Sequence, residues 1–168
     1  MVIETIISGL VGLVSGTLGY YYTNKFVERN REFNSTKREQ LQYVFGPLDV
    51  LMKMNMKEFN RYFAEGTTSD DKSFIEQHIW YPNNSEIKRI IMEKSHLLPE
   101  IPDGFLELLT HINVWLTEYD LVYIKKIKDP PVFAGARGGG GRGYGIPNGL
   151  DDMISKRAHE LRKSLNIE

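Results

Sequence analysis

The chain has 168 residues, of which 41% are hydrophobic and 26% charged, so it is long and apolar enough for a folded domain and is not a disordered polyampholyte. Its 21 basic residues are balanced by 22 acidic ones, and this balance excludes a strongly basic nucleic-acid-binding protein, although a local basic patch remains compatible with it. The absence of cysteine excludes a disulfide scaffold, a thiolate metal site and a cysteine nucleophile, and it suits a folded part in the cytosol.

Residues 5–24 carry no charged side chain. Twenty residues in a helix span about 30 Å, which matches the hydrocarbon core of a bilayer. Three tyrosines close this run, where an interfacial aromatic belt would lie, and five basic residues follow: Lys25, Arg29, Arg31, Lys37 and Arg38. The positive-inside rule then predicts a single-pass anchor in the inner (cytoplasmic) membrane, with the N-terminus outside and residue 25 onward in the cytoplasm.

Two other interpretations of residues 5–24 compete with a retained span. A cleaved signal peptide needs a basic region before the apolar run, whereas Glu4 is the charged residue there. A buried helix of a soluble protein is compatible with the glycines and serines that dilute the hydrophobicity. The retained span is the favoured interpretation.

Small residues are sorted to one side of this predicted span. At 100° per residue, eight of the nine Gly, Ser and Thr residues between 5 and 23 share a face about 120° wide, and Ile7, Val11, Val14 and Leu18 lie opposite. Small residues let two helix backbones approach closely inside lipid, so this face predicts a homo-oligomer. The predicted oligomerisation face consists of Thr5, Ser8, Gly9, Gly12, Ser15, Gly16 and Gly19. The alternative is that glycine is simply frequent in membrane helices.

The polarity rises after Asn24, and residues 25–46 predict a juxtamembrane helical stalk with a thin apolar stripe of Phe26, Phe33 and Leu41. Pro47 is expected to kink or restart the helix. The chain is thus divided into a transmembrane helix (1–24), a stalk (25–46) and a cytosolic bundle (47–168).

Apolar residues at helical spacing predict four main helices in the bundle part. The first carries Val44, Leu48, Leu51, Met52, Met56, Phe59 and Phe63, and a loop over 64–72 follows. A short helix, 74–80, is expected to stop at Pro82. One of Asn83, Asn84 and Ser85 then caps a helix over 86–94, with Ile87, Ile90 and Ile91 facing inward.

The longest stripe comes next, ends before Asp129, and consists of Phe105, Leu108, Leu109, Ile112, Trp115, Leu116, Tyr119 and Tyr123. Residues 130–149 predict a Pro/Gly-rich loop. A last helix carries Leu150, Ile154, Ala158, Leu161 and Leu165. No segment alternates with a period of two, so the predicted fold class is all-α, a four-helix-type bundle.

The Gly-rich loop has neither a preceding strand nor a Gly-Lys-Ser/Thr sequence, so it matches no phosphate-binding motif. Arg137 and Arg142 among its glycines predict a contact with RNA or anionic lipid headgroups, against the alternative of a plain flexible linker.

The histidines give no metal site. Glu93 and His96 have the Glu-x-x-His spacing of carboxylate-bridged metal bundles, but such sites need a second motif of this kind, which the sequence lacks. No Gly-x-Ser-x-Gly sequence is present. We therefore predict no metal and no cofactor.

The last helix carries Lys156-Arg157-Ala158-His159. An N-terminal span, an all-α bundle and a basic, histidine-bearing final helix resemble the small membrane accessory protein of type VI-B CRISPR systems. The resemblance implies a divergent HEPN-like bundle that assembles into a membrane pore and supports an RNA-guided antiviral effector.

HEPN ribonucleases use an arginine, a polar residue next to it and a histidine, with four to six residues between the arginine and the histidine. Arg157 and His159 are too close together for this pattern, whereas Arg89 and His96 fit its spacing but place Ile90 where a polar residue is expected. Three hypotheses remain open: a membrane pore or membrane-perturbing oligomer, a tethered HEPN-like ribonuclease, and a tethered scaffold for a cytosolic partner.

Overall fold

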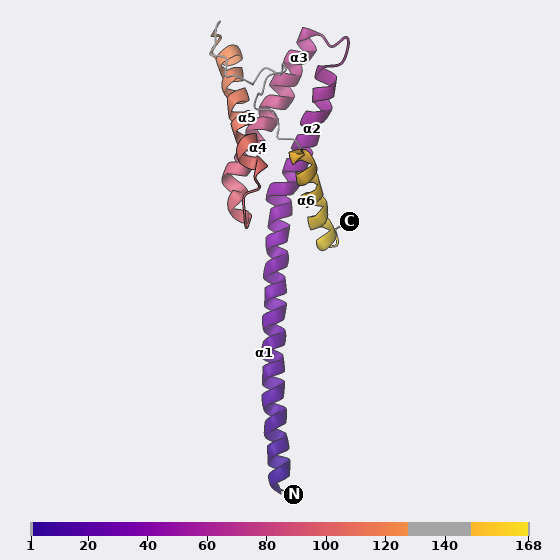
Figure 1. Cartoon of the computed structure of the whole chain (residues 1–168), viewed down its shortest axis with the longest axis vertical. Coiled ribbons are helices and arrows are strands. Elements are labelled where there is room, and N and C mark those ends of the chain that lie inside the picture. Colours follow the sequence, from indigo (N-terminus) through magenta and orange to yellow (C-terminus); the bar gives the residue numbers. More distant parts are fainter. Residues whose placement is uncertain (1, 128–148, 168) are drawn as a thin grey trace. The chain divides into compact units, whose positions relative to one another are not determined.

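The computed structural model describes residues 2–127 and 149–167, with side chains from residue 19 onward. The chain divides into two compact units, Met1–Arg38 and Glu39–Glu168. Regular structure in the described residues is entirely helical and includes no strand (Figure 1), which confirms the all-α prediction. The Gly-rich loop, with Arg137 and Arg142, lies outside the described residues.

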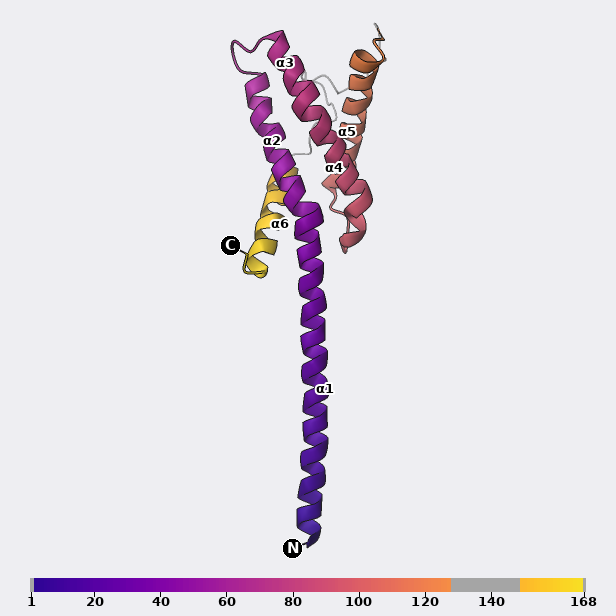
Figure 2. The same ribbon diagram turned by 180° about the vertical axis from the view of Figure 1, so that it is seen from behind.

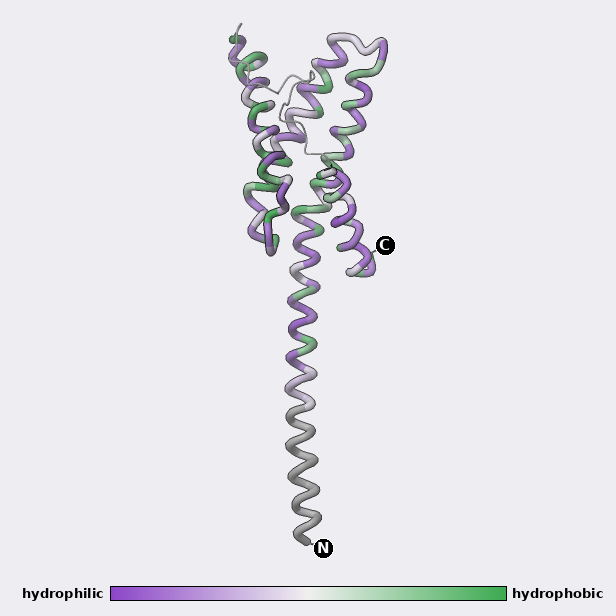
Figure 3. Tube along the Cα trace, viewed as in Figure 1, coloured by the Kyte–Doolittle hydropathy of each residue, from purple (hydrophilic) through white to green (hydrophobic). Residues whose placement is uncertain are grey.

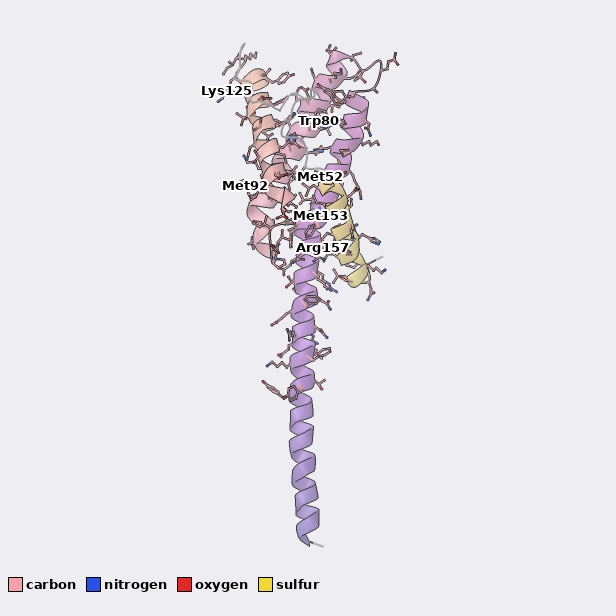
Figure 4. All side chains as sticks on the ribbon, in the orientation of Figure 1. Met52, Trp80, Met92, Lys125, Met153 and Arg157 are labelled. Carbon is pink, nitrogen blue, oxygen red and sulfur yellow. The ribbon has the colours of Figure 1, made fainter. Side chains whose placement is uncertain are left out.

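The first unit consists of the helix α1, Val2–Gln40, up to Arg38. Side chains project on all sides of its described part (Figure 4), and those of residues 19–36 are exposed. Within the described residues, no helix is both long enough and apolar enough to cross a membrane. This finding does not cover most of the uncharged run, because the side chains of residues 2–18 are not among the described ones.

The chain remains helical from α1 into α2, Gly46–Tyr62, through a π-helical turn at Leu41–Phe45. The amide of Gly46 donates to the carbonyl of Leu41, five residues back, where an α-helix would bond four residues back. Pro47 has no N–H and its ring would collide with the carbonyl four residues before it, so the wider turn accommodates the proline. The predicted kink or restart at Pro47 therefore takes the form of one π-helical turn.

The same arrangement recurs at Pro82. Helix α3, Ser69–Ile75, passes through a π-helical turn at Glu76–Trp80 into α4, Tyr81–Lys94, and the amide of Tyr81 donates to the carbonyl of Glu76. The predicted stop at Pro82 and the predicted cap at residues 83–85 are therefore wrong. Asn83 and Asn84 lie inside the helix and are buried, because the π-helical turn carries the helix past the proline.

Helix α3 also begins earlier than the loop predicted over 64–72 allows. Thr68 and Asp71 form a reciprocal capping box: the Thr68 hydroxyl accepts from the Asp71 amide, and the Asp71 carboxylate accepts from the Thr68 amide. This pair satisfies two amides that a helix start would otherwise leave unbonded, so residues 69–72 are helical.

The core of the second unit lies between α2, α4, α5 (Gly104–Tyr119) and α6 (Leu150–Ser164). In Figures 1 and 2, α6 lies beside α2 and α5 beside α4. Met153 of α6 packs against the core that contains Met52 of α2 (Figure 4). The buried core residues are Val44, Phe45, Leu48, Met52, Ile87, Ile90, Ile91, Phe105, Leu108, Ile112, Leu150, Ile154, Ala158 and Leu161.

The core confirms the inward-facing residues predicted for α4 and four of the five predicted for α6. For the apolar stripes of α2 and α5, the predicted burial is confirmed only in the half of each stripe that lies nearest the core. Met56, Phe59 and Phe63 of the first stripe and Tyr123 of the second are exposed, contrary to prediction. In Figure 3, hydrophobic and hydrophilic segments alternate along all the bundle helices, so hydropathy alone does not mark where burial ends.

Candidate functional site

Six of the seven residues of the predicted oligomerisation face lie in the part of α1 whose side chains are not described: Thr5, Ser8, Gly9, Gly12, Ser15 and Gly16. The seventh, Gly19, is exposed, and a methyl group added there would have no neighbour within 4 Å. The backbone of α1 is helical over all seven positions, which is the condition for a shared face.

The described part of α1 exposes large aromatic side chains. Tyr20, Tyr22, Phe26 and Phe33 are 73%, 67%, 66% and 59% exposed. The Lys37 ammonium lies 4.2 Å from the centre of the Phe33 ring, a cation–π contact within one turn. Isolated surface aromatics are ordinary, but several along a single helix indicate a surface that contacts lipid or protein.

The Arg89 and His96 pair is not arranged for phosphate chemistry. The Arg89 guanidinium donates to both Glu86 carboxylate oxygens, at 2.6 and 2.7 Å, and to Glu93 at 2.8 Å. The hydrogen bonds that Arg89 donates to Glu86 and then to Glu93 raise the pKa of Arg89 above its usual value. His96 is exposed in the 3-10 turn Ser95–Leu97. The guanidinium stays charged, but three of its N–H donors are engaged and the two carboxylates make the local net charge negative, which disfavours a phosphate.

Arg157 and His159, which are too close in sequence for the HEPN pattern, both lie on α6. Arg157 makes an ion pair with Glu160 at 3.3 Å, and its guanidinium carbon lies 6.0 Å from the Phe45 ring centre. His159 is exposed. Positions two apart on a helix point about 200° apart, so the two side chains leave α6 on different sides.

Among the described residues, Asp49 is the buried residue with a charged side chain, of which 5% is exposed, and no sequence motif pointed to it. It accepts a very short hydrogen bond from the Ser155 hydroxyl, lies 2.7 Å from the Lys53 ammonium and is 3.8 Å from the Arg162 guanidinium. Burial raises the pKa of Asp49, but the hydrogen bonds from Lys53 and Ser155 and the nearby positive charges outweigh it and leave the pKa below its ordinary value. This carboxylate ties α6 to α2.

Three buried asparagines join α2 to α4. The Asn55 amide donates to the Asn84 side-chain oxygen at 3.0 Å, and the Asn83 amide donates to the Asn55 oxygen at 2.8 Å. Asn55 follows the buried Met52 by three residues, so the helical period alone places it on the core-facing side of α2. An asparagine at the helical spacing of core residues is the signal in the sequence that could have identified this cluster.

Beyond the core, aromatic rings make a chain of contacts that we name the aromatic cluster. They come from α2 and the residue after it, the Glu76–Trp80 turn, α4, α5 and the π-helical turn Asp120–Ile124 that follows α5. Its members are Phe59, Tyr62, Phe63, Trp80, Tyr81, Trp115, Tyr119 and Tyr123, with successive ring centres 4.7 to 6.5 Å apart. Burial, together with a 2.7 Å hydrogen bond from the Tyr62 hydroxyl to Glu76, raises the pKa of Tyr62 to about 12. This cluster continues the predicted stripes of α2 and α5 as a half-exposed surface.

The described residues contain no group of three or more histidine, aspartate or glutamate side chains placed to hold a metal ion. An open groove of about 570 Å³ lies over the Leu41–Phe45 turn and is lined by Leu41, Gln42, Gly46, Pro47, Val50, Leu51, Glu86 and Arg162. Its lining has no convergent set of polar groups of the kind that orients a small substrate.

Comparison with known proteins gives no relative: no family model, curated protein or solved structure matches this chain.

Proposed function

We propose that this protein is a single-pass membrane protein of the inner membrane that self-associates through residues 5–24 and forms a pore or otherwise perturbs the bilayer. Its partners in this proposal are the lipid bilayer and further copies of the same chain. The bundle of residues 39–168 lies in the cytoplasm and is held at the membrane by α1.

The observation that carries the proposal is the continuous helix α1. It has 39 residues, so at 1.5 Å per residue it is about 58 Å long, enough for a bilayer core and a polar continuation. Its uncharged part, its exposed tyrosines and the basic residues after them follow the order of a membrane span, an interfacial belt and a cytoplasmic flank.

The role in antiviral defence comes from the resemblance to the type VI-B CRISPR accessory protein. In this proposal the perforating oligomer acts beside an RNA-guided effector, and the arginines of the 130–149 loop contact RNA or lipid headgroups. The ribonuclease alternative has less support, because Arg89 is held by Glu86 and Glu93 and the Arg157 and His159 side chains diverge.

The test uses the full chain, purified in detergent for a mass measurement and reconstituted in vesicles for a dye-release assay. Gly12→Ile and Gly16→Ile each add a branched side chain to the small-residue face and force neighbouring helices apart. We expect both variants to lower the oligomeric mass and abolish dye release, while Val14→Ile, on the opposite face, changes neither.

A monomeric wild-type protein, or glycine variants with the wild-type mass and dye release, would show that residues 5–24 are an anchor only. In that case the pore proposal is wrong.

A further inference from the structure

Three of the exposed aromatic residues of α1 lie along a single line. At 100° per residue, Tyr22, Phe26 and Phe33 fall within about 40° of the helix circumference. Their side chains are 67%, 66% and 59% exposed. Two phenylalanines seven residues apart repeat the spacing of a coiled-coil core position.

Phe26 and Phe33 belong to a longer register, and Tyr22 lies beside it. Gly19, Thr23, Phe26, Asn30, Phe33 and Lys37 alternate in steps of four and three, the heptad spacing of a coiled coil. Counting backward, the same steps reach Gly16, Gly12 and Gly9 of the predicted oligomerisation face. Small residues inside the span and large aromatics beyond it therefore occupy the same face of one helix.

We infer that the face formed by Gly19, Thr23, Phe26, Asn30 and Phe33, which we name the stalk seam, packs against the stalk seam of a second copy in a parallel, in-register coiled coil. This inference rests on the proposed function, because it extends the association of the spans into the polar part of α1.

The charges around the stalk seam favour a second copy as its occupant. Lys25, Glu28, Arg31, Glu32 and Arg38 all lie off the seam, so two seams can meet without burying those charges. Lys37, at the next position of the same register, ends the seam, and its ammonium lies over the Phe33 ring. Asn30 occupies a core position between the two phenylalanines. A polar Asn at such a position pairs with its equivalent in the second helix and fixes register.

The flanks of the seam select the parallel orientation. One flank carries Arg29, and the other carries the uncharged Val27 and Asn34. In a parallel pair, opposite flanks meet, so Arg29 faces Asn34 of the second copy. In an antiparallel pair, equal flanks meet and Arg29 lies against Arg29 of the second copy, which is repulsive.

Lipid does not account for the far end of the seam. If Tyr22 lies at the membrane interface, Phe33 is eleven residues further along, about 16 Å at 1.5 Å per residue. The polar layer on each side of a bilayer is only about 5 to 8 Å thick. Phe33 therefore lies in water unless protein covers it.

Because the chain has no cysteine, single cysteines report helix pairing without background. The full chain in vesicles is treated with a mild oxidant, and covalent dimers are measured on non-reducing gels. Thr23→Cys and Asn30→Cys lie on the seam, and the neighbouring Asn24→Cys and Arg31→Cys lie about 120° or more from its centre. A disulfide needs Cα atoms within about 7 Å, which the core of a parallel pair provides and its outer face does not.

We expect several-fold more covalent dimer for Thr23→Cys and Asn30→Cys than for Asn24→Cys and Arg31→Cys. Dimer at position 30 but not at 23 indicates an antiparallel pair centred near residue 30 and overturns the parallel assignment. Equal yields at seam and outer positions overturn the seam itself.

The two failures are distinguishable. If the protein is oligomeric in detergent and releases dye, but the seam cysteines do not crosslink preferentially, the proposed function stands and this inference is wrong. If the wild-type protein is monomeric, both are wrong.

Discussion

The backbone around Gly46 leaves no room for a side chain at this position. A Cβ atom at this position would collide with the carbonyl oxygen of Leu41, which the π-helical turn brings against it. Glycine within a helix normally costs stability relative to alanine, by roughly 0.5 to 1 kcal/mol. Here the close approach of the carbonyl reverses that preference.

We predict that Gly46→Ala destabilises the bundle by about 1 to 3 kcal/mol, the usual cost of forcing extra volume into a packed site. Both tryptophans of the chain, Trp80 and Trp115, lie in the bundle, so thermal unfolding followed by tryptophan fluorescence reports its stability. Asn60→Ala is the control, because it changes an exposed side chain of the same helix, α2. An unchanged or raised melting temperature for Gly46→Ala would contradict the π-helical turn.

The sequence could not predict these turns, because the rule for proline is local. A proline inside a helical pattern usually ends or kinks the helix, and this rule led to the expected stop at Pro82. The alternative is that the amide just before the proline donates to the carbonyl five residues back. Whether this hydrogen bond forms depends on how the helix packs on both sides of the turn. At Pro82 that packing includes buried Asn83 and Asn84, which local reasoning placed at a helix cap.

At the scale of elements, the attachment of α6 to α2 depends on apolar packing and on one carboxylate. Asp49 of α2 accepts from Ser155 of α6 and lies near Arg162 of α6. Because the folded pKa of Asp49 is below its ordinary value, this carboxylate stabilises the folded state at neutral pH. That contribution is lost only as the pH falls below about 4, through the folded pKa.

We predict that Asp49→Asn lowers the free energy of unfolding by about 1 to 2 kcal/mol at pH 7, the worth of charge-assisted hydrogen bonds whose cationic partners remain partly solvated. The difference from wild type should shrink as the pH falls below about 4, because the wild-type carboxylate then becomes neutral as well. Denaturant titrations at a series of pH values measure both quantities. A pH-independent difference would mean that Asp49 is not ionised in the folded protein.

The helical period of apolar residues predicted which segments of the bundle are helices, but it did not predict how far along each helix the apolar stripe is buried. Leu48 and Met52 are buried as predicted, whereas Phe59 and Phe63, on the same stripe of α2, are exposed. Period alone cannot tell how far a neighbouring helix extends along a stripe. It also treats Asn55 as polar surface, although hydrogen bonds to Asn83 and Asn84 satisfy it in the core.

At the scale of the whole molecule, the predicted sites differ in what supports them. The uncharged run and its basic flank are properties of composition, and they can be read from the sequence without a structure. The prediction of an Arg89 and His96 pair was based on their spacing in the sequence. Spacing does not reveal that the Arg89 guanidinium is hydrogen-bonded to Glu86 and Glu93. A catalytic arrangement depends on three-dimensional geometry, which a single motif match cannot supply.

The basic residues after the uncharged run predict the orientation of the chain in the membrane. Lys25, Arg29 and Arg31 lie within the first seven residues after the uncharged run, close enough to hold that end on the cytoplasmic side. We therefore expect a C-terminal fluorescent-protein fusion to fluoresce and a C-terminal alkaline phosphatase fusion to be inactive, since the phosphatase works only outside the inner membrane. Replacing these three residues together with Gln removes the charge bias and should raise phosphatase activity. An active phosphatase on the unmodified chain would place the bundle outside the membrane and remove the basis for a cytoplasmic partner.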